Sequence, residues 1–201
     1  LPQALFYARL KGIRIVYDMF DVYGIMIKHS VPGLISRIFL KLEGYMANLT
    51  DGVIVVTPLF LELLGIRSLV NMTSVINTPQ EWEYEPAPVR RRFSRERPFE
   101  IFYGGSLERK RGFKAICEAI RGMEDVHMSI AGGGADEEVL IPMFKEYDNV
   151  TYLGWLPYHE VLERSLKADL LYLLCDARDP LCRVAYPHKI YEAMMLAKPV
   201  L

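Results

Sequence analysis

The feature that most limits the fold of this chain is a repeated alternation of short apolar runs with amphipathic segments. The apolar runs have the length of buried strands, and the segments between them carry apolar residues at helical spacing. This alternation predicts parallel strands joined by crossover helices, which is the α/β class. The predicted strands are residues 13–17, 52–56, 73–76, 99–103, 126–131, 150–153 and 169–174. The predicted helices are residues 2–11, 34–49, 58–64, 113–121, 136–147 and 158–167, with a last helix beginning at Pro187.

A charged, proline-containing stretch interrupts the alternation and predicts a domain boundary. Residues 81–97 begin with Glu81, Glu83 and Glu85, continue with two prolines, and carry a group of arginines, namely Arg90, Arg91, Arg92, Arg95 and Arg97. We therefore divide the chain into a domain at 1–80, a linker at 81–97 and a domain at 98–201. For the arginines we expect a solvated linker that pairs with the glutamates. A peripheral contact with anionic lipid is the alternative.

Composition and cysteine usage limit the function classes. The 201 residues are 51% hydrophobic and 24% charged with a net charge of -1, which is typical of a globular protein and excludes nucleic acid as the main partner. No apolar run approaches the ~18 residues of a membrane span. Three cysteines at unpatterned spacing, without a secretion signal, predict reduced thiols and a cytoplasmic location. They are Cys117, Cys175 and Cys182.

The final stretch, residues 186–201, carries the strongest chemical signal. Pro187 suits the first turn of a helix, Lys189 places a cation there, and Glu192 follows one turn later on the same polar side. The unpaired N–H groups and dipole of a helix N-terminus favour an anion. A carboxylate one turn further can accept hydrogen bonds from hydroxyls, so the stretch predicts a site for a phosphate attached to a sugar. A plain amphipathic helix with a solvated polar face is the alternative.

These residues resemble the donor-site signature of retaining GT-B glycosyltransferases, in particular the family-four pattern Pro-x-Lys-x-Tyr-Glu-x-Met-x-x-x-Lys-Pro-Val. The resemblance implies that Glu192 contacts the ribose of a nucleotide sugar and that His188 and Lys189 lie beside its diphosphate. It also implies two Rossmann-like parallel-sheet halves that face a cleft, both incomplete in this chain. We interpret the chain as a fragment, and we expect it to be inactive as a transferase on its own.

Two more motifs in the second half resemble parts of the same donor site. Residues 105–112 resemble the phosphate clamp Gly-Arg-x-x-x-x-Lys-Gly, with Gly105 at its start and Arg111 in place of the lysine. Ser106 replaces the arginine of the clamp, and the basic residues at 109 and 110 are alternative cations. Gly154 and Trp155 match the turn that lies beside the nucleobase in the family. For Trp155 a role as an anchor in the core is the alternative.

The acceptor side departs further from the family pattern. The loop after the first predicted strand resembles the segment Val-x-Asp-x-His-Asp, but Phe20 stands in place of the histidine. Asp21 is the catalytic candidate in this loop, with helix capping or loop solvation as the alternative. The first glutamate of the family's acidic pair aligns with Val184, and Asp179 is its candidate substitute.

The function implied by the resemblance is transfer of a hexose from a nucleotide diphosphate sugar to an acceptor with retention of configuration. The acceptor would be a glycan, a lipid-linked molecule or a small molecule. We expect no cofactor and no metal, because cations and a helix N-terminus can stabilise the leaving diphosphate. The alternatives are a non-catalytic nucleotide-binding or scaffold module and a GT-B sugar-nucleotide epimerase.

Overall fold

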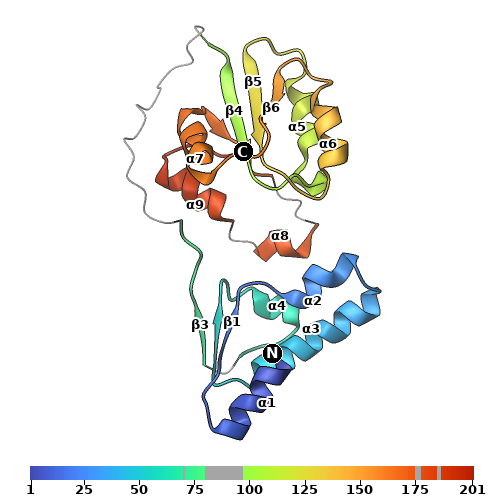
Figure 1. Ribbon diagram of the computed structural model, residues 1–201, viewed down its shortest axis with the longest axis vertical. Helices are drawn as coiled ribbons and strands as arrows, with labels where there is room; N and C mark the ends of the chain where they lie inside the picture. Colours follow the sequence, from blue (N-terminus) through green and yellow to red (C-terminus); the bar gives the residue numbers. More distant parts are fainter. Residues whose placement is uncertain (70, 80–96, 175–177, 185–186) are drawn as a thin grey trace. The chain divides into compact units, whose positions relative to one another are not determined.

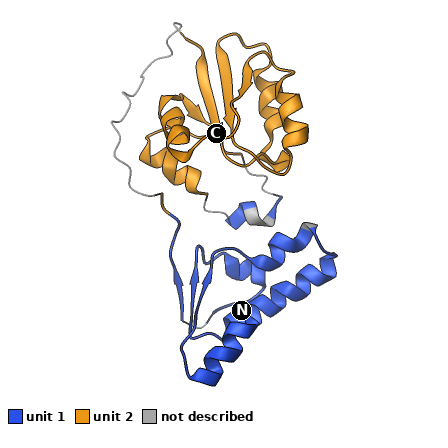
Figure 2. Ribbon diagram, viewed as in Figure 1, with its two compact units in different colours: residues 1–77, 177–186 blue, residues 78–176, 187–201 orange. Residues whose placement is uncertain are grey.

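The computed structural model describes residues 1–69, 71–79, 97–174, 178–184 and 187–201. The chain divides into two compact units, which Figure 2 shows in different colours. Unit 1 comprises residues 1–77 and 177–186, and unit 2 comprises residues 78–176 and 187–201. The linker arginines at 90, 91, 92 and 95 lie outside the described residues. Arg97 is described, and its guanidinium lies 2.7 Å from the Asp169 carboxylate.

Unit 1 contains a three-stranded parallel sheet in the order β1-β2-β3. Its strands are β1 (Val16–Met19), β2 (Gly52–Val55) and β3 (Met72–Ser74). Its helices are α1 (Pro2–Lys11), α2 (Tyr23–Met26), the 3-10 turn η1 (Ile27–His29), α3 (Gly33–Ala47), α4 (Phe60–Leu64) and α8 (Pro180–Val184). The core of unit 1 is built from β1, β2, α2, α3, α4 and α8.

A buried carboxylate fixes the loop that follows β1. Glu43 of α3 accepts hydrogen bonds from the backbone N–H groups of Tyr23 and Gly24, both at 3.1 Å, and from the Tyr17 hydroxyl at 3.2 Å. The two N–H groups belong to the first turn of α2, so Glu43 satisfies donors that the helix itself leaves unpaired. Burial and the neighbouring Glu43 charge raise the pKa of Tyr17 to about 12, which keeps its hydroxyl a donor.

Unit 2 contains a four-stranded parallel sheet in the order β6-β5-β4-β7. Its strands are β4 (Phe99–Gly104), β5 (Val126–Ala131), β6 (Val150–Tyr152) and β7 (Leu170–Leu171). Its helices are the 3-10 turn η2 (Arg109–Arg111), α5 (Phe113–Ile120), α6 (Glu137–Phe144), α7 (Tyr158–Lys167) and α9 (His188–Met195). Figure 1 shows α5 and α6 on one face of this sheet and α7 and α9 on the other.

Each face of the unit 2 sheet buries its own apolar cluster. The face towards α5 and α6 holds an aromatic group in which the rings of Tyr103 and Phe113 meet edge to face with centroids 4.8 Å apart. The other face holds a smaller cluster around Phe102, Leu171 and Ala193. Because α9 contributes Ala193 to this second cluster, the polar side of α9 is left beside the carboxyl end of β4.

The predicted fold class of two parallel-sheet α/β halves is confirmed. The strand predicted at residues 13–17 lies instead at Val16–Met19, because pairing begins at Val16 opposite Gly52. The helix α8 was not predicted, since residues 175–185 were interpreted as a loop. Pro187 precedes the first residue of α9 as its N-cap rather than lying in its first turn.

One prediction about the cysteines is wrong. Cys117 is a free, buried thiol, as expected. Cys182 is disulfide-bonded, so the prediction of three reduced thiols fails for this residue. A disulfide at Cys182 is not the state that a reducing cytoplasm favours.

Candidate functional site

The carboxyl ends of β4, β5 and β6 are locked together by glycine backbones. Gly105 N–H donates to the Ala131 carbonyl at 2.9 Å, and Gly132 N–H donates to the Gly154 carbonyl at 2.8 Å. A Cβ atom at Gly132 would lie 1.9 Å from the Gly105 carbonyl oxygen, and the φ angle of Gly132 is +126°. Only glycine fits both that contact and that backbone angle. The three loops therefore present bare backbone at the edge of the sheet where ligands of parallel α/β sheets bind.

The loop from β4 to α5 is held by its own charged residues. The Arg109 backbone N–H and guanidinium both contact the Asp136 carboxylate, at 2.9 and 3.2 Å. Lys110 lies 2.9 Å from the Glu108 carboxylate. The two bases considered as substitutes for the clamp arginine thus already have carboxylate partners. The Ser106 carbonyl accepts a hydrogen bond from the Tyr103 hydroxyl at 2.6 Å.

Gly105, Gly132 and Gly154 together form what we call the glycine edge. Lys189 of α9 brings a cation to this edge. Its ammonium lies 4.1 Å from the centre of the Tyr103 ring, and a Cβ atom at Gly105 would lie 2.0 Å from it. Within the described ranges it makes no ion pair or hydrogen bond. Burial first, and then the nearby Arg111 charge, lower the pKa of Lys189 to about 8. This is the electrostatic environment of a cation that gains from the arrival of an anion.

Arg111 supplies a second positive charge to the same place. Its carbonyl accepts a hydrogen bond from the Tyr172 hydroxyl at 2.7 Å, which fixes the backbone at the end of η2. Its charge also acts on both Tyr103 and Lys189. Two cations that repel each other beside loops whose glycines lack side chains suit a ligand with two adjacent negative charges, such as a diphosphate.

The start of α9 adds to this arrangement. Pro187 is the N-cap, and no side chain caps the helix. His188 is its first residue, and its side chain is exposed. The positive end of the helix dipole thus lies next to Lys189, which makes the α9 N-terminus favourable for an anion.

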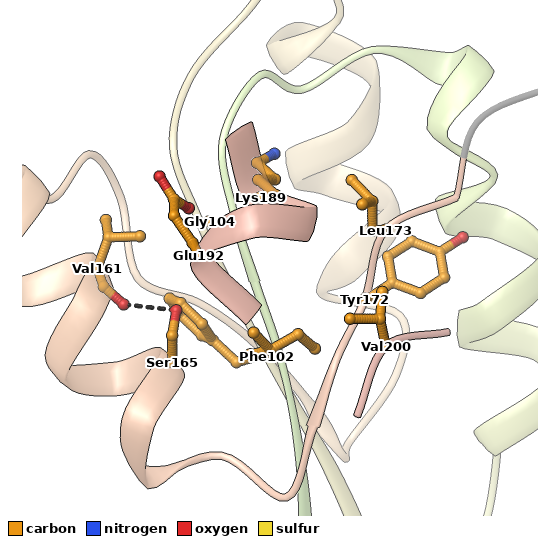
Figure 3. Close-up of a pocket in the computed structure, with 10 residues that line it drawn as sticks. Phe102, Gly104, Val161, Ser165, Tyr172, Leu173, Lys189, Glu192 and Val200 are labelled. Carbon is orange, nitrogen blue, oxygen red and sulfur yellow. Dashed lines mark hydrogen bonds between the residues drawn. The ribbon is translucent and has the colours of Figure 1, made fainter. Parts of the chain in front are cut away.

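Glu192 lies one turn beyond Lys189 and is held by a residue that the sequence did not suggest. The Tyr158 hydroxyl donates to Glu192 Oε1 at 2.9 Å. Figure 3 shows Lys189 and Glu192 of α9 among the residues that line a hollow, together with apolar residues such as Phe102 and Val200. The only sequence signal for Tyr158 was its place at the helix start after the Gly154–Trp155 turn. That signal says nothing about its partner.

The predicted base-pocket turn lies beside the glycine edge. Gly154 has a φ angle of +78° and its carbonyl accepts from Gly132 N–H. Trp155 is 75% exposed, so the alternative role of Trp155 as a core anchor is wrong. An exposed indole on this turn can offer a flat apolar face, and its contact with a nucleobase stays a prediction.

The predicted acceptor-side residues belong to unit 1 and are not brought into this site by the geometry of unit 2. Asp21 follows β1, and partial burial raises the pKa of its carboxyl. Phe20, at the position of the family's histidine, is exposed. Val184 is buried in the core of unit 1, so the position of the family's first glutamate is a packing position here.

Among the described residues, no group of three or more histidine, cysteine, aspartate or glutamate side chains could hold a metal ion. In the same residues, no helix is both long and apolar enough to cross a membrane.

Known proteins share sequence features and the fold with this chain. A model of the family described as glycosyl transferases group 1 matches residues 89–201. No curated protein matches the chain. Among solved structures, HepE of Anabaena in complex with UDP and glucose superimposes with a TM-score of 0.63 at 17% identity, covering 98% of this chain and 54% of HepE.

Two other structures are similar. Sucrose-phosphate synthase from Thermosynechococcus elongatus has a TM-score of 0.68 at 16% identity, covering 96% of this chain and 51% of that enzyme. The lipopolysaccharide outer core galactosyltransferase WaaB has a TM-score of 0.62 at 16% identity, covering 98% and 52%. At these identities the likeness concerns the GT-B fold. The chain spans about half the length of the structures it matches.

Proposed function

The chain belongs to the family of glycosyl transferases group 1, and from this premise we propose that unit 2 binds a nucleotide diphosphate sugar for transfer of its sugar to an acceptor. The observation that carries this proposal is that Lys189 and Glu192 lie on the same side of α9, one turn apart. Lys189 and the charge of Arg111 stand beside the glycine edge, where a diphosphate fits. Glu192, one turn away, is placed to accept hydrogen bonds from ribose hydroxyls.

The finer parts of the proposal concern the reaction. The transferred group is a hexose, the configuration at its anomeric carbon is retained, and no metal takes part. Lys189, Arg111 and the α9 N-terminus would stabilise the negative charge that develops on the leaving diphosphate, which is the role a metal plays elsewhere. The presence of UDP and glucose in the HepE structure supports a nucleoside diphosphate and a hexose as the parts of the donor. Asp21 remains the proposed catalytic residue, and His188 and Trp155 remain proposed contacts of the diphosphate and the base.

The acceptor and the cellular location also remain proposals. A glycan, a lipid-linked molecule or a small molecule would serve as acceptor, and the protein would act in the cytoplasm, with or without peripheral contact to a membrane. Of the arginine group, Arg97 lies within the described residues, and it forms an ion pair with Asp169. Its charge therefore gives no support for a contact with anionic lipid. A non-catalytic nucleotide-binding module is the second candidate, favoured by the burial of Val184 where the family has a glutamate.

The replacement Glu192→Gln tests the assignment of the site. Glutamine keeps an acceptor oxygen but loses the charge that strengthens hydrogen bonds from hydroxyls. We expect the variant to bind the nucleoside and the nucleoside diphosphate about tenfold more weakly, the factor for about 1.4 kcal/mol. Inorganic pyrophosphate should bind as well or better, because a repelling carboxylate has gone. Calorimetric titration of the 201-residue chain measures all three ligands.

The matched control is Glu118→Gln, since Glu118 also accepts from a tyrosine hydroxyl, at 2.8 Å from Tyr147, but belongs to α5 on the opposite face of the sheet. This variant should bind all three ligands as the unaltered chain does. An unchanged nucleoside affinity in Glu192→Gln would reduce Glu192 to a surface residue of a structural helix.

A further inference from the structure

The hydrogen bond between Tyr158 and Glu192 joins the start of α7 to the polar side of α9. Tyr158 is the first residue of α7, and its hydroxyl lies 2.9 Å from Glu192 Oε1. The residue is 53% exposed, so burial of apolar surface alone does not explain its position. In the described part of the chain, Tyr158 is the residue that hydrogen-bonds to the Glu192 side chain.

Without the hydrogen bond from Tyr158, the Glu192 carboxylate would be free to turn towards the ammonium of Lys189. Lys189 and Glu192 are three residues apart on one helix, a spacing at which a cation and a carboxylate commonly pair. The two charges attract each other. Nevertheless no ion pair forms between them within 4.0 Å in the described residues. An ion pair between them would neutralise both Lys189, which we assign to the diphosphate, and Glu192, which we assign to the ribose.

We propose that Tyr158 is a positioning residue that holds the Glu192 carboxylate ready for the ribose hydroxyls and keeps it away from Lys189. This inference rests on the proposed function and adds to it the residue that gives the site its preference for a ribonucleotide. A glutamate side chain fixed before the ligand arrives loses less rotamer freedom on binding, which favours the complex. Burial and the Glu192 charge raise the pKa of Tyr158 to about 12, so the hydroxyl keeps its proton and remains a donor at physiological pH.

The arrangement of the carboxylate predicts a preference for ribose. One oxygen of Glu192 is engaged by Tyr158, and the second is available to accept from a hydroxyl of the ligand. Rotation of the carboxylate towards Lys189 would withdraw that second oxygen. The contribution of Tyr158 should therefore be largest with ligands that carry both ribose hydroxyls.

The experiment uses Tyr158→Phe, which removes the hydroxyl and keeps the ring, together with Glu192→Gln and the double variant. The ligands are the diphosphate of uridine, guanosine or adenosine that the unaltered chain binds most tightly, its 2′-deoxy analogue, and inorganic pyrophosphate, titrated by calorimetry at one pH. The matched control is Tyr147→Phe, which removes a tyrosine–glutamate hydrogen bond of 2.8 Å on the other face of the sheet.

We expect Tyr158→Phe to weaken the ribonucleotide about five- to tenfold and to change the 2′-deoxy analogue less. The double variant should bind no more weakly than Glu192→Gln alone, since both changes remove the same contact. Pyrophosphate should bind more weakly to Tyr158→Phe and regain its affinity in the double variant. Tyr147→Phe should change none of these affinities.

Several results would overturn the inference while leaving the nucleotide site intact. Unchanged ribonucleotide affinity in Tyr158→Phe, or losses that add fully in the double variant, would show that Tyr158 does not act through Glu192. Unchanged pyrophosphate affinity in Tyr158→Phe would refute the separation of Glu192 from Lys189. If the unaltered chain binds none of the three nucleotides, the proposed function fails and this inference fails with it.

Discussion

Replacing Gly132 by alanine is expected to lower the free energy of unfolding by about 2–5 kcal/mol and to abolish binding of a nucleoside diphosphate. The added Cβ atom would lie 1.9 Å from the Gly105 carbonyl oxygen, and that oxygen is backbone that cannot rotate away. The φ angle of +126° adds strain of its own. Because the same contact joins the β4 and β5 loops, relieving it must separate the loops that present their backbone to the ligand.

Gly122→Ala is the matched control for this prediction. Gly122 also has a positive φ angle, +73°, but a Cβ atom there would meet no atom within 4 Å. This variant should cost about 1–2 kcal/mol from the backbone angle alone and should bind the nucleotide normally. Thermal unfolding and calorimetric titration measure both effects. If Gly132→Ala binds the nucleotide with unaltered affinity, the glycine edge is not the ligand's binding surface.

Lys189→Met is expected to weaken binding of a nucleoside diphosphate about hundredfold while raising the stability of the unliganded chain at pH 7. An ammonium that donates to phosphate oxygens contributes about 3 kcal/mol. In the unliganded chain Lys189 is partly buried, and burial and the Arg111 charge lower its pKa to about 8, so the folded state disfavours the charged ammonium. The cation–π contact with the Tyr103 ring stabilises the ammonium by about 0.5–2 kcal/mol. This is less than the cost of about 3 kcal/mol for keeping the lysine charged in the folded state, which follows from the lowered pKa. Methionine fills similar space without that cost.

The pH dependence gives an independent check on Lys189. Below pH 8 the lysine is protonated in both the folded and unfolded chain, so the full cost of its burial is present. Between pH 8 and its ordinary pKa of 10.5 the folded chain releases the proton first, so the unaltered chain gains stability relative to Lys189→Met. Nucleotide affinity should fall over the same range, since the terminal phosphate, with a pKa of about 6, is already ionised.

The exposed Lys145 at the C-cap of α6 provides the control, because Lys145→Met removes the same charge at the end of a helix that runs away from the glycine edge. It should alter neither the nucleotide affinity nor its dependence on pH. A Lys189→Met variant that is less stable than the unaltered chain, or that binds the nucleotide equally well, would contradict the role assigned to Lys189.

The fold and half of the candidate site could be predicted from the sequence because they depend on local patterns. Apolar runs such as 126–131 form strands at the predicted residues, and the residues after them must lie at one edge of a parallel sheet. Gly105, Arg111, Gly154 and Lys189 were selected because their segments resemble the donor-site motifs of the family. Their proximity follows from topology, which the alternation of strands and helices reveals.

What the sequence could not reveal are contacts between distant segments. Tyr158 and Glu192 are 34 residues apart, and no local pattern links a tyrosine at one helix start to a carboxylate on another helix. The helix α8 was missed for a related reason. It is only five residues long, and its Val184 packs into unit 1 although neighbouring residues in the chain belong to unit 2. Short helices of this kind form through tertiary packing rather than intrinsic propensity.

The measurement that tests the central claim most directly is a calorimetric titration of the unaltered 201-residue chain with UDP, GDP and ADP in the presence of a metal chelator. We expect at least one of these nucleotides to bind saturably to a single site without metal at concentrations up to about 1 mM. This is the range in which enzymes commonly bind their substrates. Binding that appears only when a divalent cation is added would contradict the role given to Lys189, Arg111 and the α9 N-terminus. Absence of binding of all three would contradict the assignment of unit 2 as a nucleotide-sugar site.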